Sequence, residues 1–318
     1  MIKDNTFIIP IIRSDLIERC LETLYKYTPN NFYVIVVDQS PKGIDMSLRD
    51  KYDNLMIIRS PRTDLHYTGN FGHSQGVNIG LQLVQTPYAT IMNDDVEFIN
   101  SKWWQGTIDT FNDVKNATPD RPALLVNVAS IRLADWSVGR ASGDHFHILP
   151  YKEEYTEEDW YFLVNEPHYV NEHLTIQPGS VVDGINLYCS VVDMEKFRKV
   201  GFIDEYWYPG NANDYDLCCR ASMFGYRCVG TTKAWVFHHW SVSFKDVNEK
   251  DEMKALLQTE LVKGNLVDKW GSRFDLWGIS CSIDGCGKIL HTENGVEASC
   301  PIHPSEVYAM PEQYISPL

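Results

Sequence analysis

The first hundred residues contain four short apolar segments of strand length, and their order limits the fold more than any other feature. The strand candidates are Thr6–Ile12, Phe32–Val37, Leu55–Ile58 and Tyr88–Met92. A helix with a capping box at Asp15 and Glu18 is predicted after the first strand, and a second helix near Gln75–Val84 before the last. Short apolar runs are typical of strands buried on both faces. The order strand, helix, strand, strand, helix, strand predicts an α/β fold with a mixed, mostly parallel sheet and helices on both faces.

Acidic residues stand at the ends of two of these strand candidates. Asp38 follows the second, and Asn93-Asp94-Asp95 follows the fourth. An isolated Asp is more often a turn former or a helix cap, but ligands of parallel sheets bind beyond the carboxyl ends of the strands. Carboxylates at one sheet edge suit a hard cation such as Mn²⁺ or Mg²⁺, which bridges them to diphosphate oxygens. These acids therefore predict a cation-assisted site.

Two further motifs lie in the second half of the chain. Asp214 stands where an amphipathic helix is predicted to begin. It is therefore either a helix cap or a general base that takes a proton from a hydroxyl. His238 and His239 end an apolar segment. A neutral imidazole there could complete a metal shell, although a lone histidine at such a place is more often a hydrogen-bonded core residue.

Composition narrows the class of ligand and the expected location. The chain has 318 residues, of which 44% are hydrophobic, and this is enough for a sizeable core. Its formal net charge of −15 disfavours nucleic acid as a partner, because nucleic-acid binders normally carry a basic face. An anionic diphosphate ligand would need a cation as mediator. The N-terminus does not resemble a signal peptide, and no apolar stretch reaches the ~20 residues of a transmembrane segment. We therefore expect a cytoplasmic protein.

In combination and in order, these motifs resemble those of the family 2 glycosyltransferases, which have the GT-A fold. The resemblance covers roughly residues 6–245 and rests on the whole set of motifs. The matching segments are Ile9–Arg13, Val36–Ser40, Asn70–Gly72, Asn78–Gly80, Asn93–Val96, Gly184–Asp193, Val200–Glu205, Asn213–Leu217 and His238–Phe244. Two positions depart from the family pattern: Asn93 stands in place of an Asp, and Asn213 in place of a Glu. The first departure leaves the cation ligand of the motif intact, and the second weakens the match while leaving the base in place.

The resemblance implies a role for each matching residue. The donor-binding residues would be Pro10, Arg13, Asp38, Asn78, Asn93 and Asp94. Among them, Asp38 would hydrogen-bond the nucleotide base and Asp94 would face the ribose. Asp95 would bind the cation, with His238 as the favoured imidazole ligand and its neighbour His239 as an open alternative. Asp214 would be the catalytic base of an inverting enzyme.

The function implied by the resemblance is a metal-dependent inverting glycosyltransferase, either a hexosyl- or a pentosyltransferase. A UDP-sugar is the expected donor, with Mn²⁺ or Mg²⁺ as cofactor, and the acceptor stays open among a glycan, a lipid-linked sugar, a protein and a modified nucleic-acid base. One alternative is a nucleotidyltransferase-like enzyme, which would need a glycine-rich basic phosphate loop where Pro10–Asp15 stands. The other is a catalytically silent nucleotide-sugar-binding module, which the joint presence of Asp38, Asp95 and Asp214 disfavours.

The middle and the end of the chain are less regular. We expect residues 112–181 to form surface loops and irregular strands, including loops that bind the acceptor. The glycosyltransferase domain is expected at residues 1–246, and residues 247–318 are expected to form a C-terminal helix and a small zinc-ribbon-like appendage. Two close pairs of zinc-type ligands in that appendage are Cys281, Cys286, Cys300 and His303. They predict one structural Zn²⁺, with reduced, unliganded cysteines as the alternative.

Overall fold

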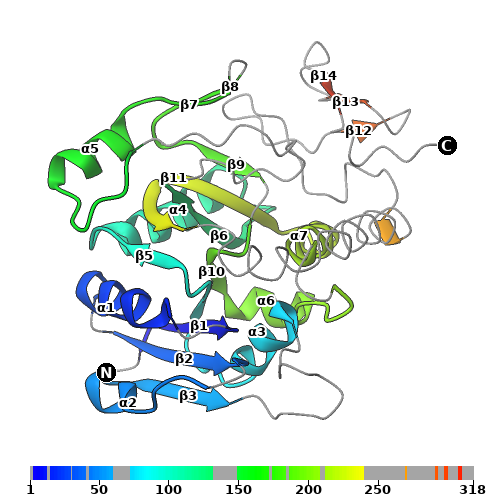
Figure 1. Cartoon of the computed structure of the whole chain (residues 1–318). Helices are drawn as coiled ribbons and strands as arrows, with labels where there is room; N and C mark the ends of the chain where they lie inside the picture. The colour runs from blue at the N-terminus through cyan, green and yellow to red at the C-terminus, as the bar shows by residue number, and fades with distance from the viewer. Residues whose placement is uncertain are drawn as a thin grey trace, which may run out of the picture.

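The computed structural model describes most of the first 239 residues and short segments beyond them. The described ranges are 3–12, 15–29, 31–40, 43–59, 72–131, 149–171, 174–183, 186–207, 212–239, 269–270, 291–292, 297–299 and 307–309. Within them, nine strands form one sheet in the order β3-β2-β1-β4-β10-β6-β11-β5, with β9 paired to β11 (Figure 1). These strands are β1 (Asn5–Ile11), β2 (Phe32–Asp38), β3 (Leu55–Arg59), β4 (Tyr88–Met92), β5 (Val96–Phe98), β6 (Ala123–Ser130), β9 (Val181–Asp183), β10 (Cys189–Asp193) and β11 (Arg227–His238).

The first half of the sheet is parallel, as the alternation of strands and helices predicts. β1 pairs in parallel with β2 on one side and β4 on the other, and β3 extends the sheet beyond β2. Parallel neighbours need crossover connections, and α1 (Ile17–Tyr27) joins β1 to β2 while α3 (His73–Leu81) precedes β4. A short helix, α2 (Leu48–Lys51), precedes β3. The predicted capping box is wrong, because α1 begins after Leu16 and has no side-chain cap.

Side chains of β1 alternate between two apolar cores, one on each face of the sheet. Phe7, Ile9 and Ile11 pack with α1, α4 (Trp103–Ala117) and α5 (Glu157–Asn165). Ile8 packs with α3, α6 (Met194–Val200) and α7 (Asn213–Met223). Successive residues of a strand point to opposite faces, so one strand supplies both cores. The result is three layers, with helices on each side of the sheet (Figure 1).

The second half of the sheet is mixed. β10 lies between β4 and β6 and runs antiparallel to both. β11 is parallel to β6 but antiparallel to β5 and β9. The expectation of a mostly parallel sheet therefore holds for the N-terminal strands. β10, which the chain reaches from β4 only after β5 to β9, runs in the opposite direction to its two neighbours.

The stretch 112–181 is more regular than expected. It contains β6, which is buried along its whole length near the middle of the sheet, and the hairpin of β7 (His168–Asn171) and β8 (Leu174–Ile176). It also contains α5, which begins with a capping box: Thr156 Oγ1 accepts from the Asp159 backbone, and the Asp159 carboxylate accepts from the Thr156 backbone. Acidic residues in a first turn are stabilised by the helix dipole. The prediction of surface loops and irregular strands was therefore wrong for β6 and α5, whereas the β7–β8 pair, which has a register shift, agrees with it.

Lys269, the last residue of the C-terminal helix predicted at 252–269, and its neighbour Trp270 contact α7. Lys269 Nζ lies 2.5 Å from Asp216 Oδ1 and 2.7 Å from Asp204 Oδ2. The indole nitrogen of Trp270 donates to Asp216 Oδ1 at 3.1 Å. Asp216 is fully buried and also pairs with Arg220 Nε at 2.8 Å. An ionic cluster therefore ties this late segment of the chain to α7.

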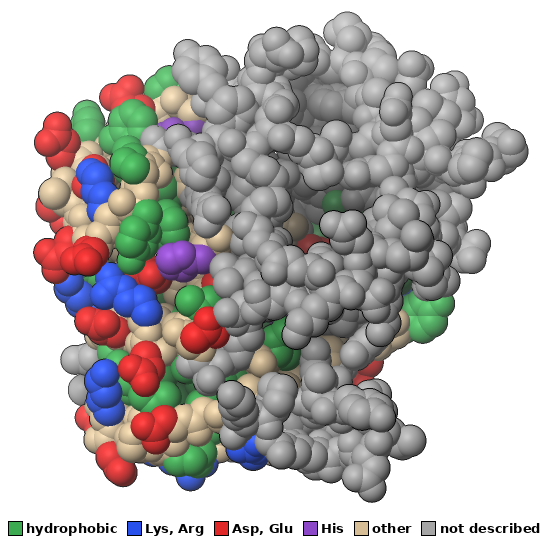
Figure 2. All heavy atoms as spheres, in the orientation of Figure 1, with side chains coloured by type: hydrophobic (Ala, Val, Ile, Leu, Met, Phe, Trp, Pro, Cys, Tyr) green, Lys and Arg blue, Asp and Glu red, His purple; other side chains and the backbone are tan. Residues whose placement is uncertain are grey.

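Three short strands lie near the C-terminus. β12 (His291–Thr292), β13 (Glu297–Ser299) and β14 (Val307–Ala309) form an antiparallel sheet in that order. The predicted zinc ligands Cys281, Cys286, Cys300 and His303 lie outside the described residues, so the zinc-ribbon prediction stays untested. Among the described helices, none combines the length and apolar character needed to cross a bilayer. Figure 2 shows acidic and basic side chains intermixed over the described part of one face.

Candidate active site

The predicted cation ligand Asp95 and the predicted histidine His238 lie side by side. Asp95 is in the turn between β4 and β5, and His238 is the last residue of β11. β11 runs antiparallel to β5 with His238 opposite Val96, and the backbone N–H of His239 donates to the carbonyl of Asp95 at 2.9 Å. This register brings His238 Nε2 to 3.1 Å from Asp95 Oδ1.

Both atoms of this pair are buried and lack a hydrogen-bond partner. Asp95 is 6% exposed and His238 is 4% exposed. Their contact is of ion-pair length but lacks hydrogen-bond geometry, and both ring nitrogens of His238 and Oδ1 of Asp95 are left without a hydrogen bond. The ring of His238 stacks on Tyr188 at 4.7 Å, and the Tyr188 hydroxyl donates to the Val128 carbonyl at 2.6 Å. The imidazole is therefore held in place by packing.

The electrostatics of Asp95 favour its carboxylate form. Burial by itself would raise the pKa of Asp95, but the neighbouring imidazole of His238 lowers it, and the net pKa lies below the ordinary value. Buried polar atoms without partners are rare in folded proteins and call for an explanation. A carboxylate oxygen and an imidazole nitrogen left without partners could together hold a divalent cation. The described residues contain no group of three or more such ligands.

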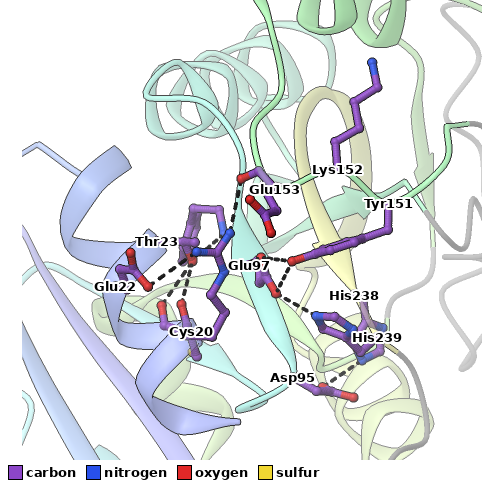
Figure 3. A network of polar contacts seen from close by, with 12 residues as sticks. Cys20, Glu22, Thr23, Asp95, Glu97, Tyr151, Lys152, Glu153, His238 and His239 are labelled. Carbon is purple, nitrogen blue, oxygen red and sulfur yellow. Dashed lines mark hydrogen bonds and ion pairs between the residues drawn. The ribbon is translucent and has the colours of Figure 1, made fainter.

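A second carboxylate, Glu97, lies next to this pair and engages the other histidine (Figure 3). Glu97 is 5% exposed, and His239 Nε2 lies 2.7 Å from its Oε1. Arg19 Nε donates to Oε2 at 3.1 Å, and the Tyr151 hydroxyl lies 3.4 Å from both oxygens. Burial would raise the pKa of Glu97, but His239 and Arg19 hold it below its ordinary value.

This network bears on the choice between the two histidines. His238 faces Asp95, whereas His239 is occupied by Glu97. Sequence reasoning missed Glu97, although a charged residue in the middle of the apolar strand β5 (Val96–Phe98) was a signal for it. The contact with Arg19, 78 positions earlier in the chain, had no local signal.

Asp214 is the second residue of α7, close to the predicted helix start. The helix follows Ala212, which has a left-handed backbone (φ 67°), and no side chain caps it. Asp214 Oδ1 accepts the backbone N–H of Tyr215 at 2.9 Å, and the side chain is half-buried. Burial raises the pKa of Asp214 to about 6, although its backbone hydrogen bonds pull the other way. A carboxyl group with a raised pKa, not engaged as the helix cap, fits a general base.

One histidine, His73, contacts the start of α7. Asn213 Nδ2 lies 3.1 Å from His73 Nδ1, and Asn213 Oδ1 accepts the backbone N–H of Asp214 at 3.0 Å. The first residue of α3 and the first residue of α7 are thus joined directly.

The predicted donor residues fall into two groups. Asp38 is buried and accepts from Ser40 Oγ at 2.5 Å, from the Ser40 backbone at 2.9 Å and from the Ile44 backbone at 3.1 Å, so its carboxylate orders the loop after β2. Pro10 lies near the end of β1, opposite Val37 of β2. Both therefore lie at the carboxyl ends of adjacent strands, where a nucleotide base was predicted. Arg13 lies outside the described residues.

The remaining predicted donor residues are more engaged within the protein. Asn78 donates to the Ile203 carbonyl at 2.8 Å and to Glu205 at 2.9 Å, and accepts from the Ile203 backbone at 3.0 Å. This placement favours a structural role, in which Asn78 fixes the loop after α6. Asp94 is buried beside Asp95, and the backbone N–H of Asn93 donates to the Tyr188 carbonyl at 2.9 Å.

Known proteins similar to the chain are glycosyltransferases. The model of glycosyl transferase family 2 matches residues 6–169, just over half of the 318 residues. Similar solved structures include the mannosyltransferase PcManGT from Pyrobaculum calidifontis in complex with GDP-Man and Mn²⁺ (13% identity, 75% of this chain, 57% of that chain, TM-score 0.47). A second is S. aureus TarS 1–349 in complex with UDP (16% identity, 74% of this chain, 60% of that chain, TM-score 0.43). A third is GalNAc-T7 with UDP, GalNAc and Mn²⁺ (11% identity, 74% of this chain, 44% of that chain, TM-score 0.49).

The similar structures are distant from this chain, which spans only 57% of the first and 44% of the last, so their ligands say nothing about its substrates. No curated protein matches the chain significantly.

Proposed function

Because the chain belongs to glycosyl transferase family 2, we propose that it is a metal-dependent inverting glycosyltransferase that uses a nucleotide-diphosphate sugar, specifically a UDP-sugar, as donor. The observation that carries the proposal is the arrangement of three side chains. Asp95 and His238 present a buried carboxylate oxygen and a buried imidazole nitrogen without hydrogen-bond partners. Asp214, a carboxyl group with a pKa of about 6, follows directly on Asn213, whose amide nitrogen lies 3.1 Å from His73 Nδ1.

Asp95 and His238 are the residues that would hold the divalent cation, Mn²⁺ or Mg²⁺. The bound cation would neutralise the charge that develops on the departing diphosphate. Glu97 is paired with His239 and Arg19. This pairing engages both the Glu97 carboxylate and the His239 ring, so neither would compete for the cation. Stacking on Tyr188 fixes the ring of His238, so little ordering is needed on binding.

Asp214 is the residue that would take the acceptor proton. The acceptor oxygen forms a bond to the anomeric carbon on the face opposite the diphosphate. The bond from that carbon to the diphosphate oxygen breaks, and its electron pair leaves with the nucleotide. The hydroxyl proton passes to Asp214. A carboxyl group with a pKa of about 6 is largely ionised at neutral pH and is a stronger base than an ordinary carboxylate.

The proposed donor class is tested by nucleotide-sugar hydrolysis and transfer with Mn²⁺. A panel of UDP- and GDP-sugars is incubated with the protein, with candidate glycan, lipid-linked, protein and modified-base acceptors. Release of UDP supports the proposal, and release of GDP only would refute the UDP assignment. Binding of a nucleotide sugar without any release would instead indicate a silent binding module.

The metal assignment is tested with a matched pair of substitutions. Asp95→Asn removes the proposed ligand charge from a buried site, whereas Asp113→Asn removes an exposed carboxylate of α4 that pairs with Lys233. Asp95→Asn should abolish turnover and Mn²⁺ binding measured by electron paramagnetic resonance, while Asp113→Asn should retain both. Normal Mn²⁺ binding by the Asp95→Asn variant would contradict the assignment.

We also keep the proposal of one structural Zn²⁺ held by Cys281, Cys286, Cys300 and His303. Its support is the spacing of these residues in the sequence. Elemental analysis of protein purified without a metal-affinity step should find about one zinc per chain. Protein free of zinc, with a C-terminal segment resistant to proteolysis, would contradict the proposal.

A further inference from the structure

One buried tyrosine, Tyr188, contacts both parts of the candidate cation site. It stands directly before β10 and is 5% exposed. Its backbone carbonyl accepts the N–H of Asn93 at 2.9 Å, in the turn that holds Asp95. Its ring stacks on that of His238, with the centroids 4.7 Å apart and the planes 15° from parallel. The turn and the histidine therefore share one neighbour.

The topology of the sheet explains how one residue reaches both. The turn that holds Asp95 joins β4 to β5, and β10, β6 and β11 lie between these two strands in the strand order. β10 runs antiparallel to β4 with Cys189 opposite Met92, so the residue before β10 lies beside the residue after β4. The hydroxyl of Tyr188 extends to β6, where it donates to the Val128 carbonyl at 2.6 Å. The ring is thus anchored at its hydroxyl end while its face lies against the end of β11.

No hydrogen bond from the described residues orients the His238 ring. Nδ1 and Nε2 are both buried without a hydrogen-bond partner, and Nε2 faces Asp95 Oδ1 at 3.1 Å (Figure 3). Metal-binding histidines normally donate their second ring N–H to a carboxylate or a carbonyl, which fixes the orientation of the ring. The face-to-face contact with Tyr188 takes the place of that hydrogen bond.

We propose that Tyr188 is a positioning residue, which holds the imidazole of His238 and the turn of Asp95 in one fixed relation so that both can bind the same cation. An imidazole binds a metal in the plane of its ring, so a tilt of the ring turns the nitrogen lone pair away from the cation. A planar neighbour stacked on the ring opposes that tilt and leaves the edge of the ring free for the ligand. This role rests on the cation site of the proposed function, whereas the stack itself does not.

The stack is tested without metal or substrate, by NMR of the histidine rings in the full chain. An aromatic ring shifts the resonances of protons held over its face upfield, so the ring protons of His238 should resonate upfield of those in free histidine. Their signals are assigned by their absence from His238→Ala. The shift should persist in Tyr188→Phe, which keeps the ring, and disappear in Tyr188→Leu. Wild-type His238 protons at the positions of free histidine would overturn the stack, whether or not either Tyr188 variant folds.

The positioning role is tested by calorimetric titration with Mn²⁺. Substitution of Tyr188 changes only the ring contact, because the carbonyl that binds Asn93 belongs to the backbone. Loss of a group that orients a metal ligand typically weakens metal binding at least ~10-fold, so Tyr188→Leu should cost about that much, and Tyr188→Phe should stay within about threefold. Because Tyr188 acts through His238, Tyr188→Leu should add less than about a threefold loss to a chain that already carries His238→Ala. An equal loss in both backgrounds would overturn positioning through His238.

A matched control is Tyr25→Leu. The Tyr25 ring also lies against an aromatic ring, that of Tyr52 at 4.6 Å, and its hydroxyl also donates to a backbone carbonyl, that of Asp53 at 2.5 Å. Tyr25 lies in α1, so its replacement should lower stability in urea unfolding and leave Mn²⁺ affinity unchanged. Equal losses of Mn²⁺ affinity in Tyr25→Leu and Tyr188→Leu would overturn the role of Tyr188.

The same titration separates this role from the proposed cation site. A wild-type chain that does not bind Mn²⁺ would refute the cation site and the positioning role with it. Wild-type binding that His238→Ala weakens but Tyr188→Leu leaves unchanged would refute the positioning role alone.

Discussion

Replacement of Asp214 by Asn should make the protein more stable and almost inactive. Burial holds the pKa of Asp214 at about 6, against an ordinary value of 3.8, which means that the folded protein disfavours the ionised carboxylate. Each pKa unit corresponds to about 1.4 kcal/mol. The ionised side chain therefore lowers the free energy of unfolding by at most about 3 kcal/mol, and the true figure is smaller because the side chain is only half-buried.

The pH dependence gives this prediction its sign. Because the folded pKa is raised, the wild type loses stability as pH rises from 3.8 through about 6, and above that pH the loss is complete. Asn does not ionise, so the variant escapes this loss. The difference between the two proteins should be smallest near pH 4, grow up to about pH 6 and then stay constant.

Urea unfolding of both proteins at several pH values between 4 and 7.5 measures this difference. Groups common to the two proteins, such as His73, contribute equally and cancel. Activity should fall ~10²- to 10⁴-fold, as is typical when a general base is lost. A difference in stability that does not change with pH, or a variant that becomes less stable than the wild type as pH rises, would refute the reasoning.

Asp216→Asn provides a control from the same helix with the opposite expected sign. Asp216 is fully buried but pairs with Arg220 and Lys269. Removing one partner of a buried ion pair typically costs 3–5 kcal/mol. Two isosteric substitutions two residues apart should therefore change stability in opposite directions at neutral pH.

Two other predictions follow from the site. His238→Ala should weaken Mn²⁺ binding at least ~10-fold in calorimetric titration, while His239→Ala should leave the affinity within about threefold. The reason is that the His238 ring faces Asp95, whereas the His239 ring pairs with Glu97. Equal losses in the two variants would contradict the assignment of His238 as the cation ligand. Gly76→Ala should cost about 1–3 kcal/mol in urea unfolding, because its Cβ would lie 2.4 Å from Gln39 Nε2 and 2.9 Å from Pro10 Cβ, and this crowding outweighs the better helix propensity of Ala. A more stable Gly76→Ala variant would show that the first turn of α3 is loosely packed.

Features set by local pattern could be predicted from the sequence. The strands β1 to β4 are short apolar runs that no helix period explains, and all four lie where expected. Asp95 and Asp214 could be proposed as site residues because each follows or begins a regular element. The start of α5 could have been predicted from Thr156 and Asp159, whose spacing is that of a capping box.

Features set by topology could not be predicted. The insertion of β10 between β4 and β6 depends on which edge is free after the earlier strands have paired, and no local property of β10 encodes that. The partners of Glu97 and of His73 are 78 and 140 positions away along the chain. Both contacts exist because strand order brings distant loops together, so the choice between His238 and His239 needed the structure.

The ionic cluster around Asp216 has a consequence for where the catalytic unit ends. A fragment cut at the predicted boundary, residue 246, would lack Lys269 and Trp270 and so would remove two of the three groups that bind this buried carboxylate. The helix that begins with Asn213 and Asp214 would then carry an undercompensated charge in its first turns. The shortest expression fragment expected to keep α7 in its native state therefore extends beyond Trp270, so that Lys269 and Trp270 are included with α7.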